Sequence, residues 1–123
     1  MPGGVTEIIF FAERNVSPAI IWLDDQPPKV QLKFVRLMEL LREQGARLSR
    51  PHAAPLRDKI YELRVRHLNV NYRLLYFFHG QGIAVVGRGC TKEREVDHAD
   101  IERAIERREK YLRRPEAHRY VET

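Results

Sequence analysis

The sequence predicts an α+β fold: a small antiparallel sheet, made of an N-terminal strand plus a three-stranded meander, with two N-terminal helices on one face and a C-terminal helix. Three observations lead to this prediction. Two stretches have apolar residues at helical spacing, a central stretch alternates apolar and polar residues, and turn residues divide that stretch into hairpins. The element order of strand, helix, helix, three strands and helix is typical of α+β proteins. A length of 123 residues fits one domain, so residues 1–123 are expected to form a single domain.

The chain begins with a predicted strand and a short helix. Val5–Phe11 is a β-branched and aromatic run that ends in polar residues, which is typical of a strand. Ser17 followed by Pro18 is a helix start signal, because serine caps free N–H groups and proline is tolerated at the first helical position. These residues predict a helix over Pro18–Leu23.

A longer second helix follows, and then a connecting loop. Pro27 and Pro28 end the short helix and begin this one, and Gly45 suits its C-terminal cap. Its apolar face is formed by residues at positions i, i+4, i+7, i+8 and i+11. These residues are Val30, Phe34, Leu37, Met38 and Leu41. Arg47–Lys59 contains two prolines and no apolar periodicity, so it is predicted to be a loop.

Three strands and a last helix complete the predicted fold. The strands are Ile60–His67, Val70–His79 and Ile83–Gly89, with turns at Leu68–Asn69 and His79–Gly82. Asp97 and Asp100 form a cap-like helix start. The apolar stripe of that helix is predicted to consist of Ile101, Ala104, Ile105, Arg108 and Leu112. The tail over residues 115–123 lacks a core signal and is expected to be loose.

Composition narrows the possible functions. The formal net charge is +5 and the sequence pI is about 9.7, which favours a polyanionic partner: nucleic acid, an acidic protein or a membrane surface. Cys90 is the only cysteine, so neither an internal disulfide nor a cysteine-based metal site is expected, and no cofactor is predicted. No apolar run approaches the length of a membrane span, and the first residues show no basic leader, so a cytoplasmic protein is expected.

Basic residues recur along the predicted strands. Alternation places Glu62, Arg64 and Arg66 on one strand face, and Arg73 joins them if the hairpin register allows it. The expected basic surface consists of Arg64, Arg66 and Arg73, extended by Arg88 and Lys92. Guanidinium groups suit phosphates because each offers a planar fork of donors and stays charged. The alternative is a solvated strand face paired with Glu62 and Asp58, and the pattern alone leaves both open.

Three stretches together resemble a known family. YELRVRHLNVNYRLLYFF, GIAVVGRGCTKE and DHADIERAIERREKYL resemble the RelE/ParE toxin superfamily, in particular its phage-derived RelE-like (HigB-type) branch. The resemblance covers roughly Pro55 to Arg114, and the upstream helical pair fits the RelE-like fold. It implies the toxin of a type II toxin–antitoxin system, a metal-independent endoribonuclease that enters the ribosomal A site and cuts translated mRNA. The implied partners are mRNA, the ribosome and a cognate antitoxin, expected to be a helix-turn-helix protein.

The resemblance also implies roles for individual residues. Arg64 and Arg73 would stabilise charge on the scissile phosphate during attack by the ribose 2′-hydroxyl, and Arg66 and Lys92 would position it. Tyr72 would contact RNA. Arg88 is also expected to contact RNA, because it extends the expected basic surface and not because of the resemblance. Arginine is a poor base, so the proton acceptor remains open between Lys92, a tyrosine and His98, which is expected in the first turn of the last helix.

Two other functions remain open from the sequence. The ParE side of the superfamily suggests a non-nucleolytic inhibitor of DNA gyrase. The lack of an obvious acid–base pair also permits a catalytically inactive RNA-binding module.

Overall fold

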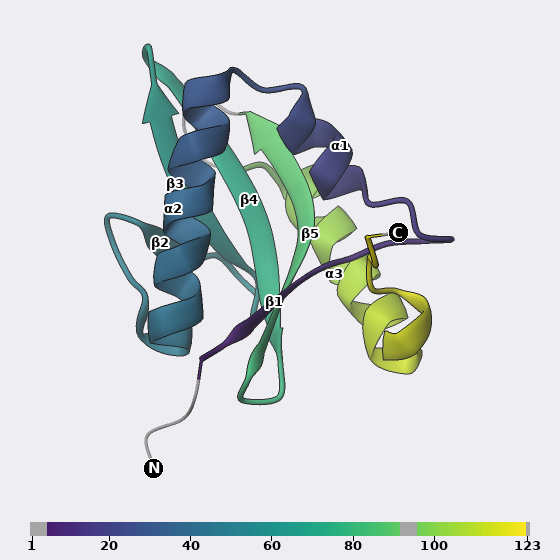
Figure 1. Ribbon diagram of the computed structural model, residues 1–123. Helices are drawn as coiled ribbons and strands as arrows, with labels where there is room; N and C mark the ends of the chain where they lie inside the picture. Colours follow the sequence, from purple (N-terminus) through teal and green to yellow (C-terminus); the bar gives the residue numbers. More distant parts are fainter. Residues whose placement is uncertain (1–4, 92–95, 123) are drawn as a thin grey trace.

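The structure is a computed structural model that describes residues 5–91 and 96–122, and within them a five-stranded mixed sheet carries helices on both faces (Figure 1). The elements are β1 (Glu7–Phe10), α1 (Pro18–Asp24), α2 (Pro28–Gln44), β2 (Ala53–Pro55), β3 (Tyr61–His67), β4 (Val70–His79), β5 (Ile83–Thr91) and α3 (His98–Arg113), with short 3₁₀ helices η1 (Gly45–Arg47) and η2 (Pro115–Ala117). The α+β class predicted from the sequence is confirmed. None of the described helices is long and apolar enough to cross a membrane.

The predicted meander forms the centre of the sheet. The strand order is β1-β5-β4-β3-β2, and β3, β4 and β5 are antiparallel neighbours. The β3–β4 turn is made by Leu68 and Asn69, whose φ angles of 49° and 66° both lie in the left-handed region. Two such residues form the tight turn whose twist matches that of the flanking strands. The strand order places β4 in the middle of the sheet. This central position explains why both of its faces carry apolar residues.

The two outer strands differ from the sequence prediction. β1 pairs with β5 in parallel, with Glu7 opposite Ile83, so the sheet is mixed and not purely antiparallel. Part of the predicted loop forms β2, which pairs with β3 and places Ala53 opposite Leu63. β2 has only three residues and lies at the sheet edge, where Pro55 is tolerated because one side of an edge strand needs no N–H donor. A strand this short has no detectable periodicity.

Helices α1 and α2 cover one face of the sheet. The Ser17 Oγ accepts a hydrogen bond from the Ile20 amide at 3.2 Å, which confirms the predicted cap. Gly45 has a φ of 56° where α2 ends, and a Cβ there would lie 2.7 Å from Thr6 Oγ1. The buried residues of α2 are Val30, Phe34, Leu37 and Leu41, all on the predicted face. They pack on the sheet face that carries Leu63, Leu74 and Val86.

Helix α3 covers part of the opposite face. The Asp97 carboxylate accepts from the Asp100 amide at 3.2 Å and begins the helix, as predicted. Ile101 and Ala104 are buried, but Leu112 is 47% exposed and Tyr111 takes the expected core position. Both Tyr111 and Leu112 fit a 3.6-residue period after Ala104. Of the two, the larger tyrosine side chain is the one that packs, with its ring against Phe77. The sheet face that was predicted to carry the basic surface is therefore covered by α3 over part of its area.

The prediction of a loose C-terminal tail is wrong for residues 118–120, because these residues pair with the end of β1 and the residues that follow it. The Tyr120 amide donates to the Phe10 carbonyl at 2.8 Å, and the Ala12 amide donates to the His118 carbonyl at 3.0 Å. The His118 ring stacks on Phe11 with the ring centroids 5.4 Å apart. These contacts join residues about a hundred positions apart, so no local pattern in the sequence could indicate them.

Burial of Tyr76 predicts a stability loss at alkaline pH. Desolvation, together with the nearby Tyr61 and Glu62, raises the pKa of the Tyr76 hydroxyl above its ordinary value of 10.0. An unfolded tyrosine ionises at lower pH, so this contribution to stability is full below about pH 10 and is lost as pH rises toward the folded pKa. Between about pH 8 and pH 11, Tyr76→Phe should lose less unfolding free energy in urea than the wild type. Equal losses would show that Tyr76 does not contribute to alkaline unfolding.

Candidate functional site

The β3–β4 register brings the strand arginines together. Arg64 lies directly opposite Arg73, so the two side chains share one face of the sheet. Arg66 lies on the same face, opposite Asn71, and donates a hydrogen bond to the Asn69 side chain at 3.2 Å. The register that the sequence left open is thus the one that clusters the three arginines.

A buried carboxylate lies between two of these arginines. Glu62 Oε1 accepts from Arg73 Nη1 at 2.5 Å, and Glu62 Oε2 lies 3.8 Å from Arg64 Nε. The side chains of Glu62 and Arg73 are 6% and 7% exposed, whereas that of Arg64 is 38% exposed. A buried charge of this kind is tolerated when a close partner compensates for lost hydration. The structure therefore gives Arg73 a neutralising partner and leaves Arg64 facing solvent.

A pocket of about 430 Å³ opens beside this pair. Its charged lining consists of Arg50, Arg57, Glu62, Arg64 and Arg73. Among the residues that the structure describes, Glu62 is the only carboxylate in that lining. A second hollow of about 210 Å³ shares Arg64 and Arg73 and is also lined by Arg66 and Asn71. The two arginines that face each other across β3 and β4 thus border both hollows.

Two pocket residues, Arg50 and Arg57, were missed by sequence reasoning. Both belong to the stretch predicted to be a loop, where they flank the two prolines that precede β3. Charged residues in a loop carry no periodicity, so the sequence offers only their nearness to the strand as a signal. Their place in the pocket follows from the pairing of β2 with β3, which holds this segment against the sheet.

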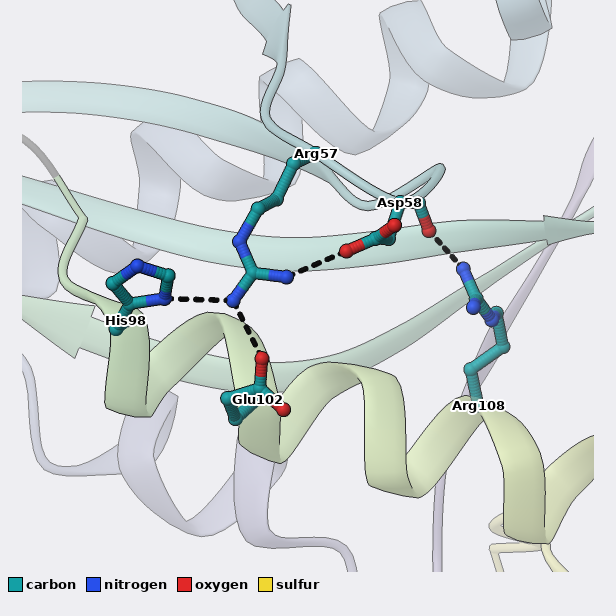
Figure 2. A network of polar contacts seen from close by, with 5 residues as sticks. All are labelled: Arg57, Asp58, His98, Glu102 and Arg108. Atoms are coloured by element: carbon teal, nitrogen blue, oxygen red, sulfur yellow. Dashed lines mark hydrogen bonds and ion pairs between the residues drawn. The ribbon is translucent and has the colours of Figure 1, made fainter.

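Arg57 is held by a network that joins the β2–β3 segment to α3 (Figure 2). Its guanidinium donates to Glu102 Oε2 and to Asp58 Oδ2, each at 2.5 Å. The bond to Glu102 and that to Asp58 raise the pKa of Arg57 above its ordinary value. Arg108 of α3 donates to the Asp58 carbonyl and adds a second link between the two segments (Figure 2). The network places the start of α3 beside the pocket.

His98 belongs to the same network rather than to the pocket lining. Its Nδ1 lies 2.8 Å from Arg57 Nη2 (Figure 2). A guanidinium can only donate, so this nitrogen is the acceptor and the proton of the neutral ring lies on Nε2. The ring nitrogen that would accept a proton is thereby already occupied, which disfavours the predicted role of His98 as the base.

The other predicted site residues are spread over the molecule. Tyr72 lies on the opposite sheet face from the arginines, is 9% exposed and packs its ring 6.4 Å from that of Trp22. Its expected RNA contact is not supported, because it alternates with Arg73 along β4 and so points into the core. Arg88 donates to Asp100 Oδ1 at 2.7 Å and does not line either hollow. Lys92 lies outside the described residues.

The pocket has the chemistry of an anion site. Four guanidinium groups border one concavity, and a guanidinium holds its N–H donors in a plane suited to phosphate oxygens. Arg57 and Arg73 also donate to carboxylates, whereas the carboxylate contact described for Arg64 is longer, at 3.8 Å. Within residues 5–91 and 96–122, no cluster of three His, Cys, Asp or Glu side chains is placed to hold a metal ion. The arrangement can therefore bind a phosphate group and stabilise added negative charge on it.

A family model matches most of the chain. The model of a family described as "Phage derived protein Gp49-like (DUF891)" matches residues 21–109. That range runs from α1 into α3 and contains all four pocket arginines and Glu62. No curated protein matches the chain.

Proposed function

The chain belongs to the Gp49-like family of phage-derived proteins, a RelE-like toxin family, and on this premise we propose that it is the toxin of a type II toxin–antitoxin system. Its activity is cleavage of translated mRNA in the ribosomal A site, as a ribosome-dependent endoribonuclease. The observation that supports this function is the pocket in which Arg64 and Arg73 lie side by side, with Arg50 and Arg57 at its edge.

The proposed reaction is attack of a ribose 2′-hydroxyl on the adjacent phosphate. The phosphate gains negative charge as the new O–P bond forms, and donors placed around it lower that barrier. Arg64 supplies a partly exposed guanidinium for the phosphate, while the ion pair with Glu62 orients Arg73. Arg50 and Arg57 extend the basic lining along the RNA backbone. DNA lacks the 2′-hydroxyl, so the reaction is specific for RNA.

The antitoxin is the second proposed partner. A small helix-turn-helix protein encoded beside this chain would cover the basic pocket with acidic or helical segments, in keeping with the net charge of +5. Co-purification of the two proteins with loss of mRNA cleavage is the expected result. An adjacent gene product that neither binds nor reduces activity would contradict this pairing.

Arg64→Ala should abolish most activity and leave the fold intact. The side chain is 38% exposed and its nearest carboxylate contact is 3.8 Å, so its removal should cost less than about 1 kcal/mol of stability. Loss of one charge-stabilising donor should reduce cleavage by about 10- to 100-fold. The measurement is growth after induction in a bacterial host, with mapping of mRNA 5′ ends.

The matched control is Arg36→Ala, which removes an exposed arginine from α2 on the other side of the sheet. It should arrest growth and cut translated messages as the wild type does. Growth arrest with intact mRNA and stalled replication would instead indicate gyrase inhibition. If the folded wild-type protein leaves both growth and mRNA unchanged, a catalytically inactive RNA-binding module would be the function that remains.

A further inference from the structure

The pocket contains a carboxylate that binding alone does not explain. An acidic group repels a polyanion, yet Glu62 lines the site in which the phosphate is proposed to bind. We propose that Glu62 is the proton acceptor of the cleavage reaction, an inference that rests on the endoribonuclease function. Its carboxylate takes the proton of the attacking 2′-hydroxyl.

The geometry leaves Glu62 able to accept a proton. Oε1 is used by Arg73 at 2.5 Å, whereas Oε2 lies 3.8 Å from Arg64 Nε, longer than a hydrogen bond. Each carboxylate oxygen has two lone pairs, so Oε2 retains acceptor capacity toward the pocket. Glu62 also lies on β3, paired with Leu75 of the central strand, which holds the carboxylate in a fixed place.

Glu62 is also close to the groups that would hold the phosphate. The 2′-hydroxyl is attached to the carbon next to the one bearing the scissile phosphate, so its base must lie near the charge-stabilising cations. Glu62 contacts Arg73 and faces Arg64, the two arginines at the centre of the site. One side chain thus combines proximity to the phosphate with a free acceptor position.

The other candidates for the base are less well placed. His98 already uses Nδ1 as the acceptor for Arg57 and does not line the pocket. Tyr72 points to the opposite face of the sheet. The four arginines of the lining cannot act as bases near neutral pH. Among the residues that the structure describes, the pocket lining therefore offers Glu62 for this role.

The proposed step balances without a further reactant. The 2′-hydroxyl proton passes to Glu62 Oε2 while the O2′–P bond forms and the P–O5′ bond breaks. The electron pair of the broken bond goes to O5′, which takes a proton from water. Glu62 then returns its proton to the hydroxide so formed, leaving a 2′,3′-cyclic phosphate and a 5′-hydroxyl end.

The test is Glu62→Gln in single-turnover cleavage of a defined message bound to purified ribosomes. Glutamine keeps an oxygen acceptor for Arg73 but cannot take a proton, so the maximal rate should fall by about 100-fold or more. The protein concentration that gives half the maximal rate should stay close to that of the wild type. The wild-type rate should fall on the acid side as Glu62 is protonated, and this acid limb should be absent from the variant's residual activity.

Two variants serve as controls. Glu62→Asp keeps a carboxylate one methylene further back, so it should lose less activity than Glu62→Gln and retain the acid limb. Glu39→Gln removes an exposed carboxylate from α2, on the other side of the sheet, and should leave the acid limb unchanged. Thermal unfolding of each variant checks that it is folded. If Glu62→Gln does not fold, the activity and pH profile of Glu62→Asp decide whether Glu62 is the base.

The outcomes separate this inference from the function on which it rests. Glu62→Gln with the wild-type rate, or with weaker binding and an unchanged pH profile, would overturn the base and leave a residue that only orients Arg73. An acid limb missing from Glu62→Asp would also overturn it. Wild-type protein that makes no cuts on ribosomes would refute the endoribonuclease function itself, and the role of Glu62 with it.

Discussion

Gly89→Ala should lower the free energy of unfolding by about 3 kcal/mol, because the new methyl group would overlap the partly buried indole of Trp22. A Cβ built at Gly89 would lie 2.1 Å from Trp22 Cε3 and 2.2 Å from Cδ2. The indole cannot swing away, since its ring also packs edge-on against Phe34 and Tyr72. Relief of the overlap would require α1 to move away from β5, which would open the core on that face.

Gly87→Ala is the matched control for Gly89→Ala. Gly87 lies on the same strand, but a Cβ there would meet Phe77 at 3.8 Å and Arg107 at 3.9 Å, which are ordinary contacts. Its free energy of unfolding should stay within about 1 kcal/mol of the wild type. Urea unfolding of both variants gives the comparison, and equal losses would show that contact with Trp22 is not what requires glycine at position 89.

Arg73→Ala should cost about 3–5 kcal/mol of stability and remove activity at the same time, because it takes away the partner of a buried carboxylate. Glu62 and Arg73 are each less than a tenth exposed and are joined at 2.5 Å, so without Arg73 the buried Glu62 would keep its desolvation penalty and have only the more distant, exposed Arg64 beside it. Activity lost in Arg73→Ala therefore does not separate chemistry from folding. The more exposed Arg64 makes that separation possible.

A double-mutant cycle measures the coupling in this pair. Arg73→Leu and Glu62→Leu should each destabilise the protein, since each removes one member of the buried ion pair. The double variant should be more stable than the sum of the two single losses predicts, because it removes both members of the pair together. Urea unfolding of the four proteins provides the cycle, and strictly additive losses would contradict a coupled buried pair.

Sequence reasoning was most successful where neighbouring residues decide the structure. The Ser17 cap, the apolar face of α2 and the Leu68–Asn69 turn were all predicted, because each depends on groups within a few positions of one another. It failed where distant segments meet. The parallel pairing of β1 with β5 and the pairing of the C-terminal segment with β1 join parts of the chain that share no local pattern.

The candidate site shows the same division. Strand alternation and a two-residue turn were enough to predict that Arg64, Arg66 and Arg73 could share a face, as the register shows. Alternation along β4 places Tyr72 on the face opposite Arg73, so the RNA contact that the family resemblance implied for Tyr72 conflicts with the strand pattern. Local periodicity determines which way a side chain points, but not what covers it.

By itself, the sequence determined the three helices, the three strands of the meander and the net positive charge. It also determined that Arg64 and Arg66 share one face of their strand, because all these features depend on residue type and spacing along the chain. Only the tertiary structure decided that Glu62 and Arg73 are buried as a pair, that Arg64 remains exposed, and that Arg50 and Arg57 join the pocket. The physical reason is that burial and charge pairing depend on how β2 pairs with β3 and on how α3 packs against the sheet, and the residue pattern along the chain does not specify these contacts.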